Sequence, residues 1–258
     1  MLLAFNIGNT NITFGGYARD GRLALSSRLY SDSALSSDEL CYKIINMLDL
    51  YGVSPLDIEA VILASVVPVL TGRLREALQK MTQAAILEVG PGLKSGVRIR
   101  MDNPAQLGAE LLCAAVGALR RHEPPLIVMN LDTAMTLLAV DAEGSLVGGV
   151  ILPGPQLSLD ALVKNTARLP QVELEAPRRL LGANTPDCLR SGMVYGTAAL
   201  LDAMAAKMRA ALHAPQAPVV ATGTLPASIR TACETELDYR ETLILDGLYA
   251  IWQRNARR

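Results

Sequence analysis

The segments LAFNIGNT (residues 3–10) and IVMNLDT (residues 127–133) decide the fold, because both have the pattern of the same structural unit. In each segment an apolar strand ends in asparagine, and a small or acidic turn then leads to threonine. Two further strands separated by a polar turn follow each segment. These strands cover residues 12–17 and 23–29 in the first half, and 135–140 and 146–151 in the second half. The sequence therefore predicts one three-stranded unit that occurs twice.

Helical and strand patterns alternate after each three-stranded unit. A capping box at residues 36–39 opens the first helical pattern. In the first half we expect a buried strand at 61–66, a helix to about Met81, a short strand at 85–89 and an amphipathic segment at 105–121. In the second half we expect a helix over about 186–212, a strand at 218–222, a helix from about Pro226 and a last helix ending near Trp252. This alternation predicts an α/β fold in which a mixed sheet with flanking helices is made twice.

The boundary between the two copies is expected near Glu123-Pro124-Pro125. It gives an N-terminal lobe of residues 1–123 and a C-terminal lobe of residues 124–258. We expect a cleft between these two lobes, with the turns that follow the asparagines facing it.

The composition excludes several classes of function. Half of the 258 residues are hydrophobic, 19% are charged and the formal net charge is −1, so the chain can bury a large core. Its lysines and arginines are scattered, and we therefore expect no nucleic-acid partner. The start of the chain lacks the basic region of a signal peptide, and the apolar run at residues 60–70 is too short to cross a bilayer. We expect a cytoplasmic protein without a membrane partner.

Cysteine and histidine chemistry has little material in this sequence. The four cysteines are isolated from one another, without the close pairs of a zinc site, and we interpret them as reduced packing residues. The only two histidines are His122 and His213, and we interpret them as surface residues.

The turn at Gly8-Asn9-Thr10-Asn11 is a candidate phosphate site. A turn rich in glycine and small polar residues lets backbone N–H groups approach a phosphate closely. Thr133 and Thr136 are the candidates on the facing side, and Thr222-Gly223-Thr224 is a third place for a phosphate or ribose. Taken alone, the Gly8 turn is better explained as a plain hairpin turn, and residues 222–224 as a simple strand-to-helix turn. The duplication favours a cage for a polyphosphate.

Glu110 is a candidate general base. It lies one turn into the helical pattern that follows Asn103-Pro104, and near a cleft it could accept a proton from a substrate hydroxyl. The alternative is a solvated glutamate on a helix.

Six segments together, in their order and spacing, resemble the type III pantothenate kinases over essentially the whole chain. They are residues 6–10 (NIGNT), 64–68 (ASVVP), 103–109 (NPAQLGA), 130–134 (NLDTA), 148–154 (GGVILPG) and 182–185 (GANT). The resemblance implies a duplicated actin-like (ribonuclease H-like) fold. It also implies transfer of the ATP γ-phosphate to pantothenate, the first step of coenzyme A synthesis, by a homodimer with Mg²⁺ and a monovalent cation, K⁺ or NH₄⁺.

The resemblance also implies a role for each site residue. Asn6, Gly8, Asn9, Thr10, Asn11 and Thr133 would bind ATP, and Glu110 would be the general base. Met101, Gly108, Ala109, Leu111 and Thr185 would bind pantothenate. Asn130 would stand at the monovalent-cation position. Asp132, where the family has Gly, is a candidate metal ligand from its spacing alone.

Several of these positions depart from the family pattern. The family has Asp at positions 6, 110 and 130, Arg at 111, usually Tyr at 101, and Gly at 132 and 224. A carboxylate about 5 Å from Mg²⁺ interacts with it by roughly 6 to 7 kcal/mol at an effective dielectric near 20, and Asn6 loses most of that. Leu111 cannot clamp a carboxylate as Arg does. These changes look like an altered site on a preserved fold.

Asp132 offers one repair. It lies two residues after Asn130 and on the same side of an extended chain, so it could return a carboxylate to the site. Alternatively, it caps its own turn.

Three functions follow as hypotheses. The first is a pantothenate kinase with Glu110 as base, and the second is a catalytically silent paralogue that serves as a nucleotide or metabolite sensor or as a regulatory partner. The third is a kinase for another small hydroxylated substrate.

Overall fold

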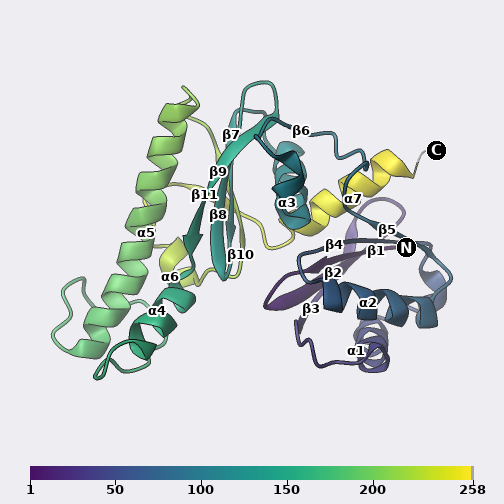
Figure 1. The fold of residues 1–258 in the computed structure, drawn as a ribbon, viewed down its shortest axis with the longest axis horizontal. Helices are drawn as coiled ribbons and strands as arrows, with labels where there is room; N and C mark the ends of the chain where they lie inside the picture. The colour runs from purple at the N-terminus through teal and green to yellow at the C-terminus, as the bar shows by residue number, and fades with distance from the viewer. Residues whose placement is uncertain (257–258) are drawn as a thin grey trace. The chain divides into compact units, whose positions relative to one another are not determined.

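The computed structural model describes residues 1–256. The chain forms two compact units (Figure 1). The first unit contains residues 1–97, residues 103–117 and the segment from Thr242 onward, and the second contains residues 98–102 and 118–241. In the described part of the chain, none of the helices combines the length and the apolar character needed to cross a membrane.

The first unit is built on a five-stranded sheet in the order β3-β2-β1-β4-β5. Its strands are β1 (Leu2–Ile7), β2 (Asn11–Tyr17), β3 (Leu23–Tyr30), β4 (Ala60–Ser65) and β5 (Ala85–Glu88). The strands β1, β2 and β3 form an antiparallel meander, while β4 and β5 run parallel to β1. The side chains of successive strand residues alternate between the faces, so Leu3, Phe5 and Ile7 enter one core together.

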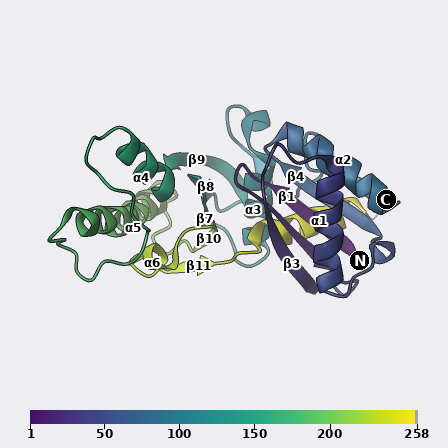
Figure 2. The same cartoon turned by 90° about the horizontal axis from the view of Figure 1, so that it is seen from below.

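Helices cover the first sheet (Figure 2). They are α1 (Ser37–Leu50), α2 (Pro68–Met81) and α7 (Leu243–Asn255). The helix α3 (Ala109–Leu119) packs against α7, and 3₁₀ turns lie at Pro55–Asp57 and Pro104–Gln106. The predicted capping box is present, because Ser36 and Glu39 cap each other at the start of α1. Apolar residues of α1 and α2, such as Ile44 and Leu74, share the core of Phe5.

The second unit repeats this design with a six-stranded sheet in the order β11-β10-β7-β8-β9-β6. Its strands are β6 (Arg98–Ile99), β7 (Leu126–Leu131), β8 (Ala134–Val140), β9 (Ser145–Pro153), β10 (Val219–Gly223) and β11 (Leu237–Tyr239). The strands β7, β8 and β9 correspond to β1, β2 and β3, and β10 and β11 correspond to β4 and β5. Only the short edge strand β6 is additional within the described chain.

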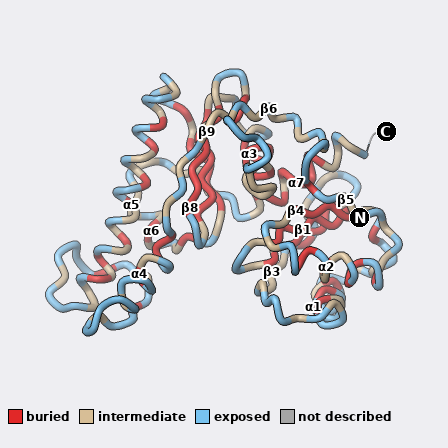
Figure 3. Tube along the Cα trace, in the orientation of Figure 1, coloured by how far each residue is buried: buried red, intermediate tan, exposed pale blue. Residues whose placement is uncertain are grey.

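Three helices accompany the second sheet: α4 (Pro155–Lys164), α5 (Thr185–Ala211) and α6 (Ala227–Arg230). Val194, Ala198 and Leu201 of α5 pack against the apolar face of β7 and β10. Figure 3 shows that buried residues are concentrated in the central strands of both sheets. The duplicated α/β fold predicted from the sequence is thus confirmed.

The compact units differ from the two lobes expected at residues 1–123 and 124–258. The helix α7 belongs to the first unit, where eight of its thirteen residues are buried. Sequence order alone had placed this helix with the second copy. A second difference is that the helical segment expected at 105–121 is split into a 3₁₀ turn and α3, with Gly108 between them.

Candidate functional site

In each sheet the candidate residues lie at the carboxyl end of a central strand. This strand is β1 in the first unit and β7 in the second. The chain leaves β1 toward β2 on one side, and returns as β4 on the other side. The strand β7 has the same place between β8 and β10. Open α/β sheets bind ligands outside the carboxyl ends of their strands, where the strand order reverses in this way. The topology therefore marks one candidate region in each unit.

A row of polar side chains crosses each sheet at this point. Asn6 pairs in register with Thr13 of β2, while Asn130 pairs with Thr136 of β8 and with Thr222 of β10. Asn130, Thr136 and Thr222 are all buried. The alternation of strand residues places each row on the sheet face opposite the core of Phe5 or of Met129. The two halves of the chain thus repeat an asparagine next to a threonine at the same register.

Asn6 has an unsatisfied side-chain acceptor. Its side chain is 8% exposed, and its Oδ1 atom is buried without a hydrogen-bond partner. Leaving a buried acceptor unpaired costs about 1–3 kcal/mol. A donor or cation supplied by a ligand would remove this cost, so Asn6 marks a place prepared for such a group.

The turn between β1 and β2 is held by several hydrogen bonds. Gly8 N donates to Asn11 O over 2.9 Å, and Ser31, the residue after β3, donates to the carbonyl oxygens of Gly8 and Thr10. Asn9 and Thr10 at the tip are exposed. The predicted phosphate turn is therefore an ordered loop with an exposed tip.

Glu110 lies beside this turn although a hundred residues separate them in the sequence. A Cβ atom placed on Gly8 would lie 3.7 Å from Glu110 Oε2. Val66 N donates to Ile7 O over 3.0 Å, which continues the pairing of β4 with β1 to the same edge. The structure thus brings Asn6, the Gly8 turn and Glu110 together within the first unit.

The start of α3 positions Glu110. Asn103 caps the preceding 3₁₀ turn, and the carbonyl of Gly108 accepts hydrogen bonds from the N–H groups of Leu111 and Leu112. Cys113 lies one turn further along the helix from Glu110. Its burial, and to a smaller extent the negative charge of Glu110, raise the pKa of the Cys113 thiol well above its ordinary value. Cys113 is therefore a neutral packing residue, as the sequence predicts.

The second unit holds Asp132 and Thr133 in a tight turn between β7 and β8. Asp132 Oδ1 accepts hydrogen bonds from Thr133 N over 2.9 Å and from Thr224 Oγ1 over 2.8 Å. Thr224 N in turn donates to Leu131 O. The carboxylate of Asp132 thus caps its own turn, which is the alternative that the sequence left open.

Two glycines allow this packing of backbone on backbone. Gly223 has φ +110°, and a Cβ atom there would lie 2.3 Å from Leu131 O. A Cβ atom on Gly154, just before α4, would lie 2.4 Å from Asp132 O. The end of β10 and the start of α4 therefore meet the turn at Thr133.

The residues predicted to bind the small substrate are divided between the units. Gly108, Ala109 and Leu111 lie in the first unit, where a Cβ atom on Gly108 would be 3.9 Å from both Leu111 and Val66. Met101 and Thr185 lie in the second unit. Met101 is half-buried after β6, and Thr185 is the exposed first residue of α5.

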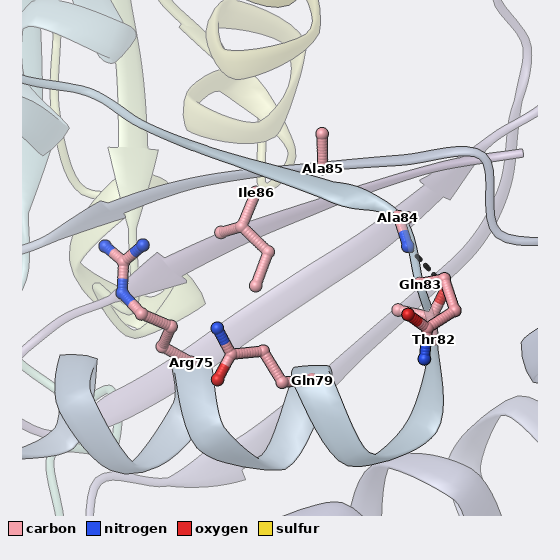
Figure 4. A pocket seen from close by; sticks show the side chains of 7 residues that line it. All are labelled: Arg75, Gln79, Thr82, Gln83, Ala84, Ala85 and Ile86. Atoms are coloured by element: carbon pink, nitrogen blue, oxygen red, sulfur yellow. Dashed lines mark hydrogen bonds between the residues drawn. The ribbon is translucent and has the colours of Figure 1, made fainter.

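A cavity of about 350 Å³ lies elsewhere in the first unit, between α2 and β5 (Figure 4). Figure 4 shows Arg75 and Gln79 extending from α2 toward Ile86 of β5. The cavity sits at the amino end of β5, whereas the candidate region is at the carboxyl ends of β1 and β4, which run parallel to β5. It is therefore separate from the candidate site.

In residues 1–256, which the structure describes, no group of three or more His, Cys, Asp and Glu side chains could hold a metal ion. His122, expected as a plain surface residue, instead contacts Asp238 through its Nε2 over 2.8 Å.

Thr13 of the first repeat corresponds to Thr136 of the second. Sequence reasoning missed Ser31, which carries no pattern that marks it.

The model of the family described as "Type III pantothenate kinase" matches residues 2–207 of the chain. Full-length relatives bear the same description. The protein from Rubrobacter xylanophilus is 40% identical over 263 residues, covering 100% of this chain and 99% of its own, and the one from Rhodospirillum centenum is 36% identical with both chains fully covered. The relative from Myxococcus xanthus is 35% identical over 99% of both chains.

Solved structures support the fold alone. A Baf family protein from Campylobacter jejuni has a TM-score of 0.59 at 20% identity, covering 99% of this chain and 100% of its own. Component A of the Acidaminococcus fermentans (R)-2-hydroxyglutaryl-CoA dehydratase has a TM-score of 0.57 at 12% identity and covers 99% of both chains.

Proposed function

Because this chain belongs to the type III pantothenate kinase family, we propose that it phosphorylates pantothenate with ATP. The observation that carries the proposal is the meeting of Asn6, the Gly8 turn and Glu110 at the carboxyl end of β1. These groups fit a phosphate binder, an acceptor for a donor or cation, and a base. They come from distant parts of the sequence, so a chance hairpin does not account for them.

The Gly8 turn would bind the phosphates of ATP. Gly8 has no side chain to keep a phosphate away from the backbone, and the tip at Asn9 and Thr10 is exposed. Thr133, in the corresponding turn of the second unit, would also bind ATP, as the resemblance implies.

Glu110 would act as the general base. Its carboxylate would take the proton from the pantothenate hydroxyl while that oxygen attacks the γ-phosphorus of ATP and ADP leaves. A glutamate is one methylene longer than the aspartate of the family pattern. Since a misplacement near 1 Å can cost about 10²-fold, we expect a slower but working base.

The residues present fit Mg²⁺ in part. The unpaired Oδ1 of Asn6 is an oxygen ligand of the kind that Mg²⁺ accepts, and Glu110 lies close to the same turn. When bound, Mg²⁺ would neutralise charge that develops on the phosphates. Asn130 would occupy the monovalent-cation position in the second unit. Asp132 would contribute to it only through the carboxylate oxygen that does not cap its own turn, because Oδ1 already accepts two hydrogen bonds. An amide binds a cation more weakly than a carboxylate, so we expect high metal concentrations to be required.

Pantothenate would be bound by Gly108, Ala109, Leu111, Met101 and Thr185. Leu111 offers an apolar contact and no charge to the substrate carboxylate. We therefore expect pantothenate to bind weakly, which would appear mainly as a raised KM for pantothenate.

We also propose a homodimer, formed through an exposed stripe on α5. The stripe consists of the small residues Gly192, Gly196, Ala199, Ala203, Ala206 and Ala210, which recur every three or four residues. A Cβ atom on Gly192 or Gly196 would meet nothing within 4 Å, so packing inside the chain does not require glycine at either position. Each glycine costs the helix about 1 kcal/mol relative to alanine. Close approach of a second α5 explains why that cost is tolerated.

The test is a kinase assay on purified protein with ATP, Mg²⁺, K⁺ and pantothenate, in which mass spectrometry detects phosphorylated pantothenate. We expect Glu110→Ala to lower kcat by about 10²- to 10⁴-fold and Glu110→Asp to retain activity. Equal product from the wild type and Glu110→Ala would contradict the proposal.

The second candidate is the silent paralogue, which the uncharged Asn6 and Asn130 favour. It would be supported if ATP raises the melting temperature while no product forms. Product from a different alcohol would instead support the third function.

A further inference from the structure

Ser31 is the first residue after β3, and both of its donors reach into the Gly8 turn. Its backbone N–H donates to Thr10 O over 2.9 Å, and its hydroxyl donates to Gly8 O over 2.6 Å. The ladder between β2 and β3 ends with the pair Asn11 and Tyr30. The backbone bond of Ser31 continues that ladder by one step, while the hydroxyl bond reaches the far side of the turn.

These bonds fix the orientation of two peptide planes. In a trans peptide the C=O and the following N–H point in opposite directions. Because Gly8 O and Thr10 O are held by Ser31, the N–H groups of Asn9 and Asn11 point away from it. The bond from Gly8 N to Asn11 O closes the turn on its other side. The carbonyl oxygens of residues 8, 10 and 11 are thus all engaged within the protein.

This arrangement suits an anion. A turn whose carbonyl oxygens are engaged elsewhere presents fewer negative dipoles to a phosphate, and its N–H groups are already oriented. The Gly8 carbonyl oxygen accepts the hydrogen bond of the Ser31 hydroxyl, and a Cβ atom placed on Gly8 would lie 3.7 Å from Glu110 Oε2. A shift of this carbonyl would therefore change both the N–H at residue 9 and the environment of the base.

We propose that Ser31 is a positioning residue for the nucleotide: its hydroxyl holds the Gly8 turn in the conformation that receives the phosphates. This inference rests on the proposed function and adds to it a residue outside every segment that predicted the site. Ser31 acts through the turn, and the proposal requires no contact between its side chain and the nucleotide.

The test compares Ser31→Ala and Ser31→Thr with the wild type. Ser31→Ala keeps the backbone bond to Thr10 and removes only the hydroxyl, so the turn should loosen without unfolding. One lost hydrogen bond predicts a rise of about two- to tenfold in the KM for ATP. The KM for pantothenate should change less than twofold, and Ser31→Thr, which keeps a hydroxyl, should restore the KM for ATP.

The matched control is Ser95→Ala, also in the first unit. The Ser95 hydroxyl is half-buried like that of Ser31 and donates to a backbone carbonyl, Val97 O, over 3.2 Å. Its loss should leave both KM values within twofold of the wild type. Equal KM values for ATP in Ser31→Ala and Ser95→Ala would overturn the role of Ser31.

A second measurement separates this inference from the proposed function. Hydrogen exchange of the peptide covering residues 6–13, without ATP, should be faster in Ser31→Ala than in Ser95→Ala or the wild type. Unchanged exchange would overturn the role of Ser31 even in an active enzyme. If Ser31→Ala exchanges faster but the wild-type protein neither binds nor uses ATP, the proposed function is wrong. In that case Ser31 only stabilises the turn.

Discussion

At the scale of a single residue, Asp238 of the second unit has neighbours that favour the ionised form of its carboxylate. Partial burial opposes its charge, but hydrogen bonds from His122 and Arg240 and the charge of Arg240 outweigh that effect and hold its pKa below the usual value. Arg121 adds a further positive charge at 3.8 Å. A carboxylate with a lowered pKa stabilises the folded state above its unfolded pKa, near 3.9, and loses this contribution as the pH falls through its folded pKa.

We therefore predict that Asp238→Asn lowers stability by about 1 kcal/mol at neutral pH. The difference from the wild type should shrink steadily below about pH 4, because the wild-type carboxylate then becomes protonated. Melting temperatures of both proteins across pH 2.5–7 measure this effect. A difference that stays constant over that range would show that the charge of Asp238 is not its cause.

Residues of the site were predictable where local chemistry marks them. The Gly8 turn has a composition typical of a phosphate turn, and Glu110 lies one turn into the helical pattern that follows Asn103-Pro104. Their meeting was not predictable, because it depends on how α3 packs in the first unit. Ser31 was missed because a serine after a strand is common, and only the tertiary position of its hydroxyl gives it a role.

At the scale of elements, a dimer formed through the stripe on α5, as proposed above, would be sensitive to side-chain size in that stripe. We predict that Gly196→Leu converts the proposed dimer to a monomer, because a bulky side chain would keep a second helix away. Gly196→Ala adds only a methyl group and should leave the dimer intact. Light scattering measures the molar mass of each variant, and a Gly196→Leu protein that remains a dimer would place the interface elsewhere.

The longest helix was predicted within a residue or two, whereas the ten-residue helix α4 was not expected. The helix expected over 186–212 is α5, Thr185–Ala211, because Asn184 caps it and Pro186 starts it. The strands β6 and β11 were not expected, since two or three residues carry no readable period. The helix expected from Pro226 has only four residues.

At the scale of the whole molecule, α7 completes a unit whose other parts precede it by more than a hundred residues. It crosses α3 through two glycines. A Cβ atom on Gly247 would lie 1.8 Å from Cys113 O, and one on Gly117 would lie 2.3 Å from Leu243 O. The stacked rings of Tyr17 and Tyr249, 4.5 Å apart, fasten α7 to β2 as well.

We predict that Gly247→Ala destabilises the protein by about 2–4 kcal/mol, because the methyl group has no room and the helices must separate. Gly72→Ala is the matched control. Gly72 also lies in a helix, but a Cβ atom there would meet nothing within 4 Å, so alanine should be neutral or add up to about 1 kcal/mol. Urea unfolding measures both variants, and similar midpoints would contradict the close crossing.

The return of α7 to the first sheet has a consequence for biosynthesis. A ribosome adds about 5–20 residues per second, so roughly ten to thirty seconds pass between the emergence of β5 and that of α7. During that interval the face of β1, β2 and β4 that α7 later covers is without its helix. The nascent chain then depends on chaperones, or on rapid completion, to avoid aggregation. For the same reason, a premature stop codon just before Thr242 would damage the half of the protein that was made first.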